Sequence, residues 1–210
     1  MNLGDNMKKV IIIGIITILL IIILPEYKYN NDYFNISTYI SSVDKDNDNI
    51  DDQTDILNNA KKYVQTKPKY KSKYYGTGYP NDEYGVCTDV VGFALKDAGY
   101  DLMTLVNEDV KLHKERYNIK IIDKNIDFRR VNNLNIYFKY NSISLTLNPK
   151  EISSWQGGDI VVFKKHIGIV SDKRNNKGIN YVIHHAHPFQ INYEEDILEE
   201  YEIIGHYRIS

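Results

Sequence analysis

The sequence predicts an α+β domain in which helices come first along the chain and an antiparallel sheet follows. Three observations carry this expectation. Apolar residues recur at helical intervals between residues 55 and 117, β-branched residues gather in short runs after Ser153, and turn-forming residues separate those runs. Because helices followed by consecutive strands are typical of α+β domains, we expect the strands to pair with one another as antiparallel hairpins.

Composition narrows the range of functions. The chain has 210 residues and a mass of 24.5 kDa, which suits one ordinary domain with an appendage. Its single cysteine, Cys87, excludes an intrachain disulfide framework and cysteine-ligated zinc or iron–sulfur centres. The formal net charge of −2 is unlike that of nucleic-acid-binding domains, which are strongly basic. We therefore expect no nucleic acid among the partners.

The first segment, residues 1–26, has the features of an export signal. Lys8 and Lys9 precede an unbroken apolar run from Val10 to Leu24. As a helix this run would rise about 22 Å, short of a hydrocarbon core of ~30 Å, so it fits a signal peptide or a short signal anchor. A small-residue cleavage site is missing after the run, which favours the uncleaved anchor. The protein is therefore expected outside the bacterial cytoplasm, anchored in the cell membrane by this helix or secreted.

Residues 27–55 are rich in Asn, Asp and Ser and predict a tether. Within it, carboxylates at relative positions 1, 3, 5, 9 and 12 have the spacing that wraps oxygen ligands around calcium; they are Asp44, Asp46, Asp48, Asp52 and Asp55. The segment resembles the Asp-rich calcium repeats of thrombospondin-type and related bacterial surface proteins. Asn49 stands at the turn position in place of glycine, and Asn tolerates a left-handed backbone better than most residues. A structural calcium ion is one interpretation, and a solvated acidic linker is the other.

Three helices are expected in the first half of the domain. Apolar spacing predicts a helix over 55–64, with Asp55 as its N-cap, and another over 102–117. Between them, apolar residues recur at helical intervals over 87–98. Gly99 follows at the position where helices commonly end.

Short runs of β-branched residues predict the sheet. The strand candidates are residues 159–163, 166–170, 181–184 and 203–209. The turn-prone residues 172–178 separate the second run from the third, which favours a hairpin. No further linker interrupts the chain, so residues 56–210 are expected to form one domain.

Cys87 falls in the first turn of a predicted helix, directly after a glycine-rich loop over 74–84. The positive end of the helix dipole and its free N–H groups favour the thiolate, which is the reactive form of cysteine. A junction between loop and helix also leaves a nucleophile accessible. The alternative interpretation is a small buried hydrophobic residue.

Five of the six histidines lie in the strand region; they are His166, His184, His185, His187 and His206. A nucleophilic thiol needs a base within hydrogen-bond reach, and the base needs a polar group that fixes its tautomer. If the strands that carry His166 and His184 pair as a hairpin, both side chains come to the same end of the sheet. The sequence leaves two registers open, with His166 opposite His184 or opposite His185.

Several segments in order resemble the NlpC-type papain-like cell-wall peptidases. They are Tyr75-Gly-Thr-Gly78, Gly85-Val-Cys-Thr-Asp-Val-Val91, Trp155-Gln-Gly-Gly-Asp-Ile-Val161, His166-Ile-Gly-Ile-Val170 and Val182-Ile-His184. A closer resemblance, over about residues 54–210, is to domain-of-unknown-function family 1287, which is grouped with the same superfamily. It is carried by the cysteine segment, Asn125-Ile-Asp-Phe-Arg-Arg-Val131, His166-Ile-Gly-Ile-Val-Ser-Asp172 and Gly205-His-Tyr-Arg208.

The resemblance implies a papain-like fold with the nucleophile at a helix N-terminus packed on an antiparallel sheet. It implies Cys87 as nucleophile, His166 as general base and His184 as the orienting group, with His185 as the second choice for that third position. It implies no cofactor for catalysis. NlpC-type enzymes usually have Asp-Cys-Ser-Gly around the nucleophile, whereas this chain has Val-Cys-Thr-Asp, so the surroundings of the sulfur differ.

Three further residues are site candidates. Tyr75 matches the loop tyrosine of the family, whose hydroxyl is expected near the thiol, and Tyr79 is the fallback. Arg129 is a candidate for binding a substrate carboxylate, because Arg binds carboxylates bidentately; an ion pair within the domain is the alternative. Asp89 is a candidate for substrate contact or for a hydrogen bond inside the first helical turn.

These features predict an exported, membrane-anchored thiol hydrolase. It would cleave peptide or amide bonds, most plausibly in peptidoglycan, by acyl transfer through Cys87. A catalytically silent cell-wall-binding module of the same fold is the alternative. A third interpretation is a metal-dependent hydrolase that uses His184, His185 and His187, although the chain has no HExxH motif.

Overall fold

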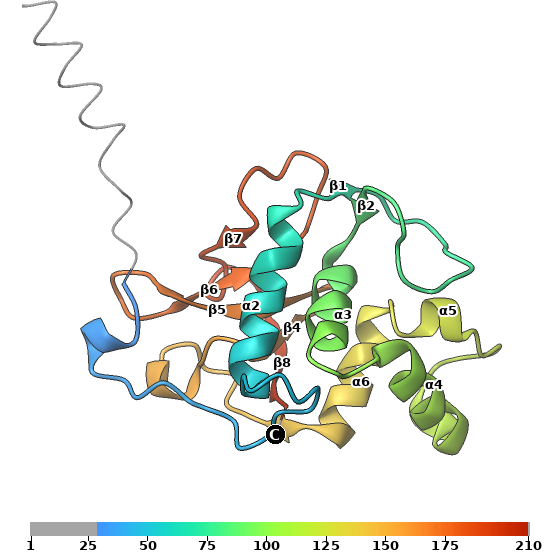
Figure 1. The fold of residues 1–210 in the computed structure, drawn as a ribbon, viewed down its shortest axis with the longest axis horizontal. Helices are drawn as coiled ribbons and strands as arrows, with labels where there is room; N and C mark the ends of the chain where they lie inside the picture. The colour runs from blue at the N-terminus through green and yellow to red at the C-terminus, as the bar shows by residue number, and fades with distance from the viewer. Residues whose placement is uncertain (1–28, 210) are drawn as a thin grey trace, which may run out of the picture.

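The computed structural model describes residues 29–209 (Figure 1). Short 3₁₀ turns are η1 (Asp32–Phe34), η2 (Lys114–Arg116) and η3 (Ile152–Ser154), and the helices are α2 (Asp52–Gln65), α3 (Cys87–Asp97), α4 (Leu102–Leu112), α5 (Lys124–Asp127) and α6 (Val131–Asn141). The strands are β1 (Lys69–Tyr70), β2 (Tyr84–Gly85), β3 (Ile143–Ser144), β4 (Ile160–Phe163), β5 (His166–Arg174), β6 (Asn180–Ile183), β7 (Glu194–Glu195) and β8 (Ile203–Arg208).

The apolar run at residues 10–24, expected to anchor the protein, lies outside the described residues. No helix within residues 29–209 is long and apolar enough to cross a membrane.

The predicted α+β class is confirmed by the sheet. Six strands form it in the order β3-β8-β4-β5-β6-β7, and every neighbouring pair is antiparallel. Strands β1 and β2 form a separate parallel pair of two residues each. All four strand candidates from the sequence are present, as β4, β5, β6 and β8.

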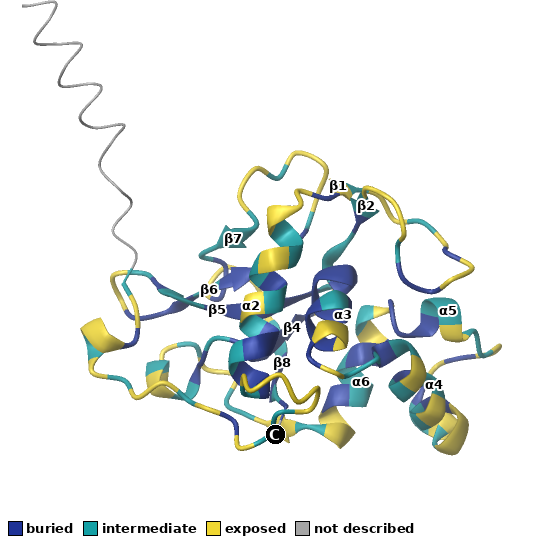
Figure 2. Ribbon diagram, in the orientation of Figure 1, coloured by how far each residue is buried: buried dark blue, intermediate teal, exposed yellow. Residues whose placement is uncertain are grey.

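Helices α2 and α3 pack side by side across one face of the sheet (Figure 1). Because side chains alternate along a strand, Ile167 and Ile169 of β5 point toward these helices and join their core. Val170 and Phe163 belong to a second cluster on the opposite face. Figure 2 shows the result, with buried residues concentrated in α3 and the central strands. Burial of each large apolar side chain stabilises the fold by about 1.5–3 kcal/mol.

The helices differ from the prediction at three places. Helix α4, predicted over 102–117, ends at Leu112, where the chain passes into the turn η2. Helix α2 begins at Asp52 with Asp51 as its N-cap, because the Asp51 carboxylate accepts the N–H of Thr54. Asp55 as N-cap is therefore wrong, and the carboxylate four residues earlier has that role. Helix α6 was not predicted at all, since its Asn-rich sequence has weak apolar periodicity. At the end of α3, Gly99 takes φ +85°, the left-handed conformation expected of a helix stop.

The buried carboxylate of Asp159 links helix α2 to the start of strand β4. It is fully buried and accepts hydrogen bonds from Gln53 of α2 (2.9 Å) and from Arg208 of β8 (2.7 and 2.8 Å). His206 Nε2 lies 3.0 Å from the same carboxylate, and its ring stacks on Trp155 at 3.6 Å. Both rings therefore have a packing role in the core.

Residues 29–51, expected to form a tether, run along the domain. Asn31 is buried and donates to Gln156 Oε1 at 2.9 Å. Arg174, at the end of β5, is also fully buried. Its guanidinium donates to Asn31 Oδ1 at 2.7 Å and to the carbonyl oxygens of residues 152, 155 and 178 at 2.6–3.0 Å. The Arg174 guanidinium thus holds the N-terminal segment, the turn η3 and the β5–β6 hairpin together.

Replacing Arg174 with methionine should lower the free energy of unfolding by about 3–5 kcal/mol, because four buried acceptors would lose their donor. Urea unfolding of the purified chain measures the change. Lys177→Met, on the same hairpin, is the control, since Lys177 is exposed and only pairs with Glu199 at the surface; its cost should stay under about 1 kcal/mol. Equal losses in the two variants would show that the buried guanidinium does not hold these segments together.

Candidate active site

Cys87 begins helix α3, and its sulfur lies against the start of strand β5. The backbone N–H groups of Ile167, Thr88 and Cys87 itself are directed at the sulfur. The amide nitrogen of Ile167 is bonded to the carbonyl carbon of His166, so the sulfur lies one peptide unit away from His166. The fold therefore brings together two residues that stand about 80 positions apart in the sequence.

The thiol of Cys87 is protonated in the resting protein. Cys87 is half-buried, and the loss of hydration around its sulfur raises the pKa of the thiol to about 11, by more than the N–H of Ile167 lowers it. The charge of Asp89 also raises the pKa of the thiol. The thiolate expected from the helix start is therefore not the resting form, because loss of hydration outweighs the dipole and the N–H groups.

The register of β5 and β6 differs from both registers left open by the sequence. Ile169 pairs with Ile183, which sets Gly168, and not His166, opposite His184. A Cβ at position 168 would lie 2.8 Å from the carbonyl oxygen of Ile183 and 3.3 Å from Cβ of His184. Glycine at this position therefore gives the His184 side chain the room to reach diagonally across to His166.

The side chains of His166, His184 and Glu195 lie in contact one after another, and we call this set the relay. His166 Nε2 lies 2.9 Å from His184 Nδ1 in a hydrogen bond, and His184 Nε2 lies 3.0 Å from a carboxylate oxygen of Glu195 in β7, within ion-pair distance. Because a carboxylate attracts a proton, we assign the proton of His184 to Nε2, so that its Nδ1 accepts the Nε2–H of His166. This assignment leaves the lone pair of His166 at Nδ1, the nitrogen nearer the backbone.

Both relay histidines are neutral at physiological pH. Burial lowers the pKa of His166 to about 4 and that of His184 to about 3, and neighbouring histidines lower both further. Nδ1 of His166 has no hydrogen-bond partner among the described residues, and no hydrogen bond joins it to the sulfur of Cys87 in this structure. The ring therefore has the neutral form and the free lone pair that a general base requires.

The relay and the sulfur meet where β6 leaves the sheet. In the antiparallel ladder the N–H of Ile167 points to the β6 side, but the pairing of β5 with β6 ends at Ile169 and Ile183, so Ile167 has no partner strand there. The freed N–H of Ile167 faces the sulfur. The next residue, His185, is buried with an unpartnered Nδ1 and lies edge-on to Tyr70, so His184 alone pairs with His166.

The two candidates for substrate binding pair with each other. Arg129 donates to both carboxylate oxygens of Asp89 at 2.7 and 2.8 Å, and both side chains are buried. Asp89 also accepts the N–H of Val86 at 2.8 Å, and Arg129 also donates to the carbonyl oxygen of Lys73 at 2.7 Å. The geometry favours the ion pair and the helix-turn hydrogen bond over contact with substrate.

The loop tyrosines are also engaged within the domain. The hydroxyl of Tyr75 donates to Asp82 at 2.7 Å, and its ring lies 5.0 Å from the guanidinium of Arg129. The hydroxyl of Tyr79 donates to Asp101 at 2.8 Å. Neither hydroxyl bonds to the thiol in this structure, and the role expected of Tyr75 stays a prediction.

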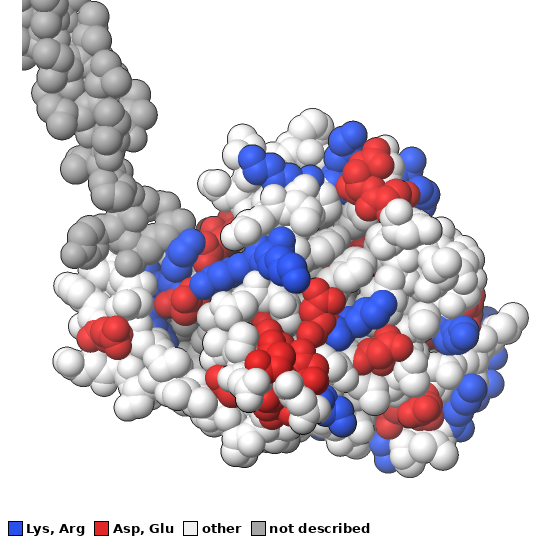
Figure 3. Space-filling view, in the orientation of Figure 1, with Lys and Arg blue, Asp and Glu red and all other residues white. Residues whose placement is uncertain are grey.

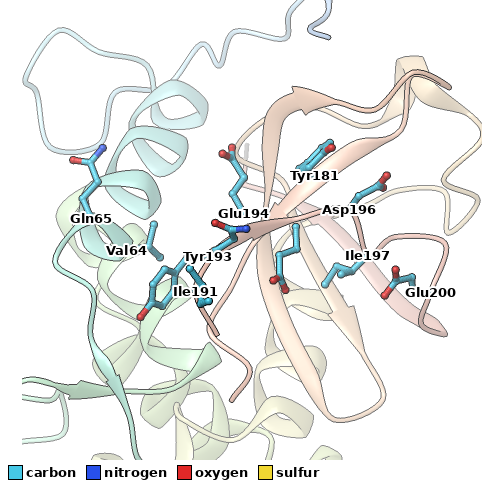
Figure 4. A pocket seen from close by; sticks show the side chains of 11 residues that line it. Val64, Gln65, Tyr181, Ile191, Tyr193, Glu194, Asp196, Ile197 and Glu200 are labelled. Carbon is cyan, nitrogen blue, oxygen red and sulfur yellow. The ribbon is translucent and has the colours of Figure 1, made fainter. Parts of the chain in front are cut away.

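A groove of about 560 Å³ opens onto the relay. His166 and His184 line it together with Lys164 and Lys165 of the β4–β5 turn, and Tyr201 lies across from them. Glu195, Ile197 and Glu200 line both this groove and a neighbouring one of about 630 Å³ (Figure 4). In the neighbouring groove, Tyr193 and α2 form one wall, and Asp196 and Glu200 lie at the other side. Cys87 lines neither groove.

Glu195 was missed by sequence reasoning. It stands in an acidic run, residues 194–196, that gives no indication of which carboxylate faces a histidine. The two neighbouring carboxylates contact other residues. Glu194 pairs with Lys173, and Asp196 accepts a hydrogen bond from Asn175 at 2.9 Å. Only the pairing of β6 with β7 shows that Glu195 belongs to the relay.

Among residues 29–209, one group of carboxylates is arranged to hold a metal ion. Asp44, Asp46 and Asp48 offer oxygen atoms that all lie within 4.8 Å of one another. Asp52 and Asp55 lie outside this group, and their places among the expected ligands stay a prediction. The Asp52 carboxylate accepts the N–H of Lys45 and the hydroxyl of Tyr100. The cluster of His184, His185 and His187 forms no such group in the described part of the chain.

Most of the chain matches a known protein family. Residues 57–209 match the family described as Domain of unknown function (DUF1287). The chain is 34% identical over 166 residues to the uncharacterized protein YijF of Escherichia coli strain K12, an alignment that covers 73% of this chain and 80% of YijF. No solved structure matches.

Replacing Arg129 with methionine should cost about 3–5 kcal/mol of stability, because it leaves Asp89 buried and without its cation. Arg130→Met is the matched control, since Arg130 is half exposed and pairs with Asp127 only at 3.8 Å; its cost should stay under about 1 kcal/mol. Chemical denaturation measures both variants. Similar stability of the two variants would contradict the structural role given to Arg129.

The relay also predicts how stability depends on pH. In the folded chain the pKa values of His166 and His184 lie below the unfolded value of 6.5, so the unfolded chain binds protons more readily than the folded one. The free energy of unfolding is therefore highest above pH 6.5 and falls toward pH 4. His184→Gln should lose less stability over this interval than the natural chain, by on the order of 2–3 kcal/mol. Denaturation at pH 7, 5.5 and 4 measures the slope. His113→Gln, outside the relay, is the control, and a slope unchanged by His184→Gln would refute the assignment.

Proposed function

The chain belongs to the DUF1287 family, and we propose that it is a thiol hydrolase of the NlpC-type papain-like kind, with Cys87 as nucleophile and His166 as general base. His184 orients His166, and Glu195 fixes the tautomer of His184. The substrate is an amide or peptide bond, and peptidoglycan is the substrate class we favour. The proposed setting is outside the cytoplasm, with residues 1–26 as membrane anchor.

One observation supports the proposal above the others. The relay directs the N–H of His166 toward His184 and leaves the lone pair on Nδ1, while the next peptide unit contacts the sulfur. A Cys–His–His arrangement needs this division of the two ring nitrogens, because one must accept the thiol proton while the other is held. Hydrogen bonds between nucleophile and base are often long before substrate binds.

The protonation states favour a concerted start of the reaction. The resting pair is a neutral thiol beside a neutral imidazole, so the proton moves to His166 Nδ1 as the sulfur attacks the carbonyl carbon. The protonated His166 then gives this proton to the leaving amine as the C–N bond breaks. Water, deprotonated by His166, hydrolyses the thioester and restores the thiol. N–H groups at the start of α3 are suited to stabilise the oxyanion.

The groove at the relay suits a substrate that carries both charges. Lys164 and Lys165 line it, and so do the carboxylates Glu200 and Glu202. A short peptide with a free carboxylate and a free amine matches this arrangement. The peptides of peptidoglycan have both groups, which supports the wall as the site of action.

A catalytically silent wall-binding module is the second candidate. The raised pKa of Cys87 and the absence of a hydrogen bond between its sulfur and a histidine favour it. The same groove would then bind wall peptides without cleaving them. The two candidates differ in one measurable property, which is the release of fragments.

Incubation of the purified chain with peptidoglycan, followed by mass spectrometry of soluble fragments, tests the proposal. Cys87→Ala and His166→Ala should each reduce fragment release by at least about 10³-fold, because either change removes acyl transfer. His184→Gln should reduce release by about 10–100-fold. Since burial lowers the pKa of His166 to about 4, kcat/KM should stay level from pH 7 down to about pH 5 and fall below it.

His113→Ala is the control and should release fragments at the natural rate. Fragment release that survives Cys87→Ala would exclude the thiol mechanism. No release by the natural chain, together with co-sedimentation with peptidoglycan, would favour the binding module instead.

A further inference from the structure

A further groove shares the β4–β5 turn with the groove at the relay. We call it the basic groove; it has a volume of about 670 Å³ and lies between this turn and the start of helix α6. Four cationic side chains line it, and they are Arg116, Arg130, Lys164 and Lys165. Pockets that hold small organic ligands have volumes of ~300–1,000 Å³. The basic groove is therefore large enough for a small ligand or for one segment of a longer molecule.

The charge in the basic groove has one sign. Among the described residues that line it there is no aspartate or glutamate, and the uncharged polar residues are all asparagines. Basic and acidic side chains are interspersed over the face shown in Figure 3, so a groove lined by cations alone differs from that surface. A cleft lined by charges of one sign focuses the electric field and concentrates ions of the opposite sign. The basic groove therefore attracts anions.

The protein itself pairs these four cations only weakly. Lys164 and Lys165 are exposed and have no hydrogen-bond or ion-pair partner within residues 29–209. The two arginines approach carboxylates only at 3.8–3.9 Å, which is longer than a hydrogen bond. Ion pairs of this kind near the surface contribute little free energy. The positive charges are therefore available to a ligand.

The basic groove is continuous with the groove at the relay. Lys164 and Lys165 line both grooves, and they directly precede His166. They form the tight connection between β4 and β5, because Phe163 pairs with His166 in the ladder. A molecule that crosses this turn can therefore occupy both grooves, with one part on the arginines and another part at His166.

We propose that the basic groove binds an oxyanionic group, a carboxylate or a phosphate, of the molecule that is cleaved at the relay. This inference rests on the proposed function for the position of the scissile bond. The planar guanidinium groups of Arg116 and Arg130 match the geometry of both oxyanions, and the lysines add positive charge beside them. The asparagine amides of the groove supply further N–H donors. The substrate is thus an amide that carries an anionic group near the scissile bond.

Calorimetric titration of the purified full chain tests the groove at constant ionic strength. The probes are sodium citrate, which carries carboxylates, and sodium pyrophosphate, which carries phosphates. We expect one probe molecule per chain, bound less tightly in a second series at higher sodium chloride concentration. Arg130→Gln should weaken binding at least about tenfold, because a hydrogen bond between charged groups is lost. Adding Lys165→Gln to this variant should weaken binding further.

Lys62→Gln is the control, since it removes a positive charge from an exposed position on α2 that lines neither groove. It should bind both probes within about twofold of the natural chain. Equal weakening by Arg130→Gln and Lys62→Gln, or no binding of either probe, would overturn the proposal. Tighter binding of citrate identifies the group as a carboxylate, and tighter binding of pyrophosphate identifies it as a phosphate. Circular dichroism before titration establishes that each variant is folded.

The kinetics of cleavage of soluble peptidoglycan fragments separate this inference from the proposed function. Arg130→Gln should raise KM by about tenfold and leave kcat nearly unchanged, because it removes binding away from the reacting atoms. An unchanged KM in a variant that binds the probes more weakly would overturn the link between the basic groove and the substrate. No cleavage by the natural chain would contradict the proposed function, and probe binding would then test the groove by itself.

Discussion

The buried ion pair of Asp89 and Arg129 is the interaction on which the arrangement of the site depends. Asp89 stands two residues after Cys87 and caps the N–H of Val86, so it holds the first turn of α3 from inside. Arg129, between α5 and α6, holds that carboxylate and also donates to the carbonyl oxygen of Lys73 in the loop before α3. A buried pair with both ends hydrogen-bonded keeps its geometry, because loss of either partner would leave a buried charge. The position of the sulfur is thus fixed from two directions.

Two opposing effects act on that sulfur. Three backbone N–H groups favour its negative form, whereas burial beside β5 disfavours it more strongly. Burial also keeps His166 and His184 neutral, so neither imidazole carries a charge in the resting protein. The contact of His184 with Glu195 favours the tautomers in which Nδ1 of His166 carries the free lone pair.

Helix α3 runs between the proposed nucleophile and the acidic loop at residues 44–48. Its N-terminus carries Cys87, and the glycine that follows it contacts this loop. Eleven residues of helix separate the two ends by about 16 Å. Helix α2 borders both regions, because its first turn follows the loop and its last turn lines the groove beside β7. The helical layer therefore places the loop and the thiol at opposite ends of one packed unit.

The amino-acid sequence was enough to predict the α+β class, the boundaries of α3 and the strands of the sheet, because apolar periodicity and β-branched runs are local signals. The choice of His184 over His185 as partner of His166 came from the resemblance to a known family. The sequence did not determine the strand register, since a diagonal contact through Gly168 depends on which residues face each other across strands. The contact of Glu195 with His184 and the ion pair of Asp89 with Arg129 likewise depended on tertiary structure, because the sequence around an acidic residue does not indicate its partner. Whether Cys87 is a thiolate also depended on tertiary structure: the helix start is visible in the sequence, but the burial that outweighs it comes from a strand about 80 residues away.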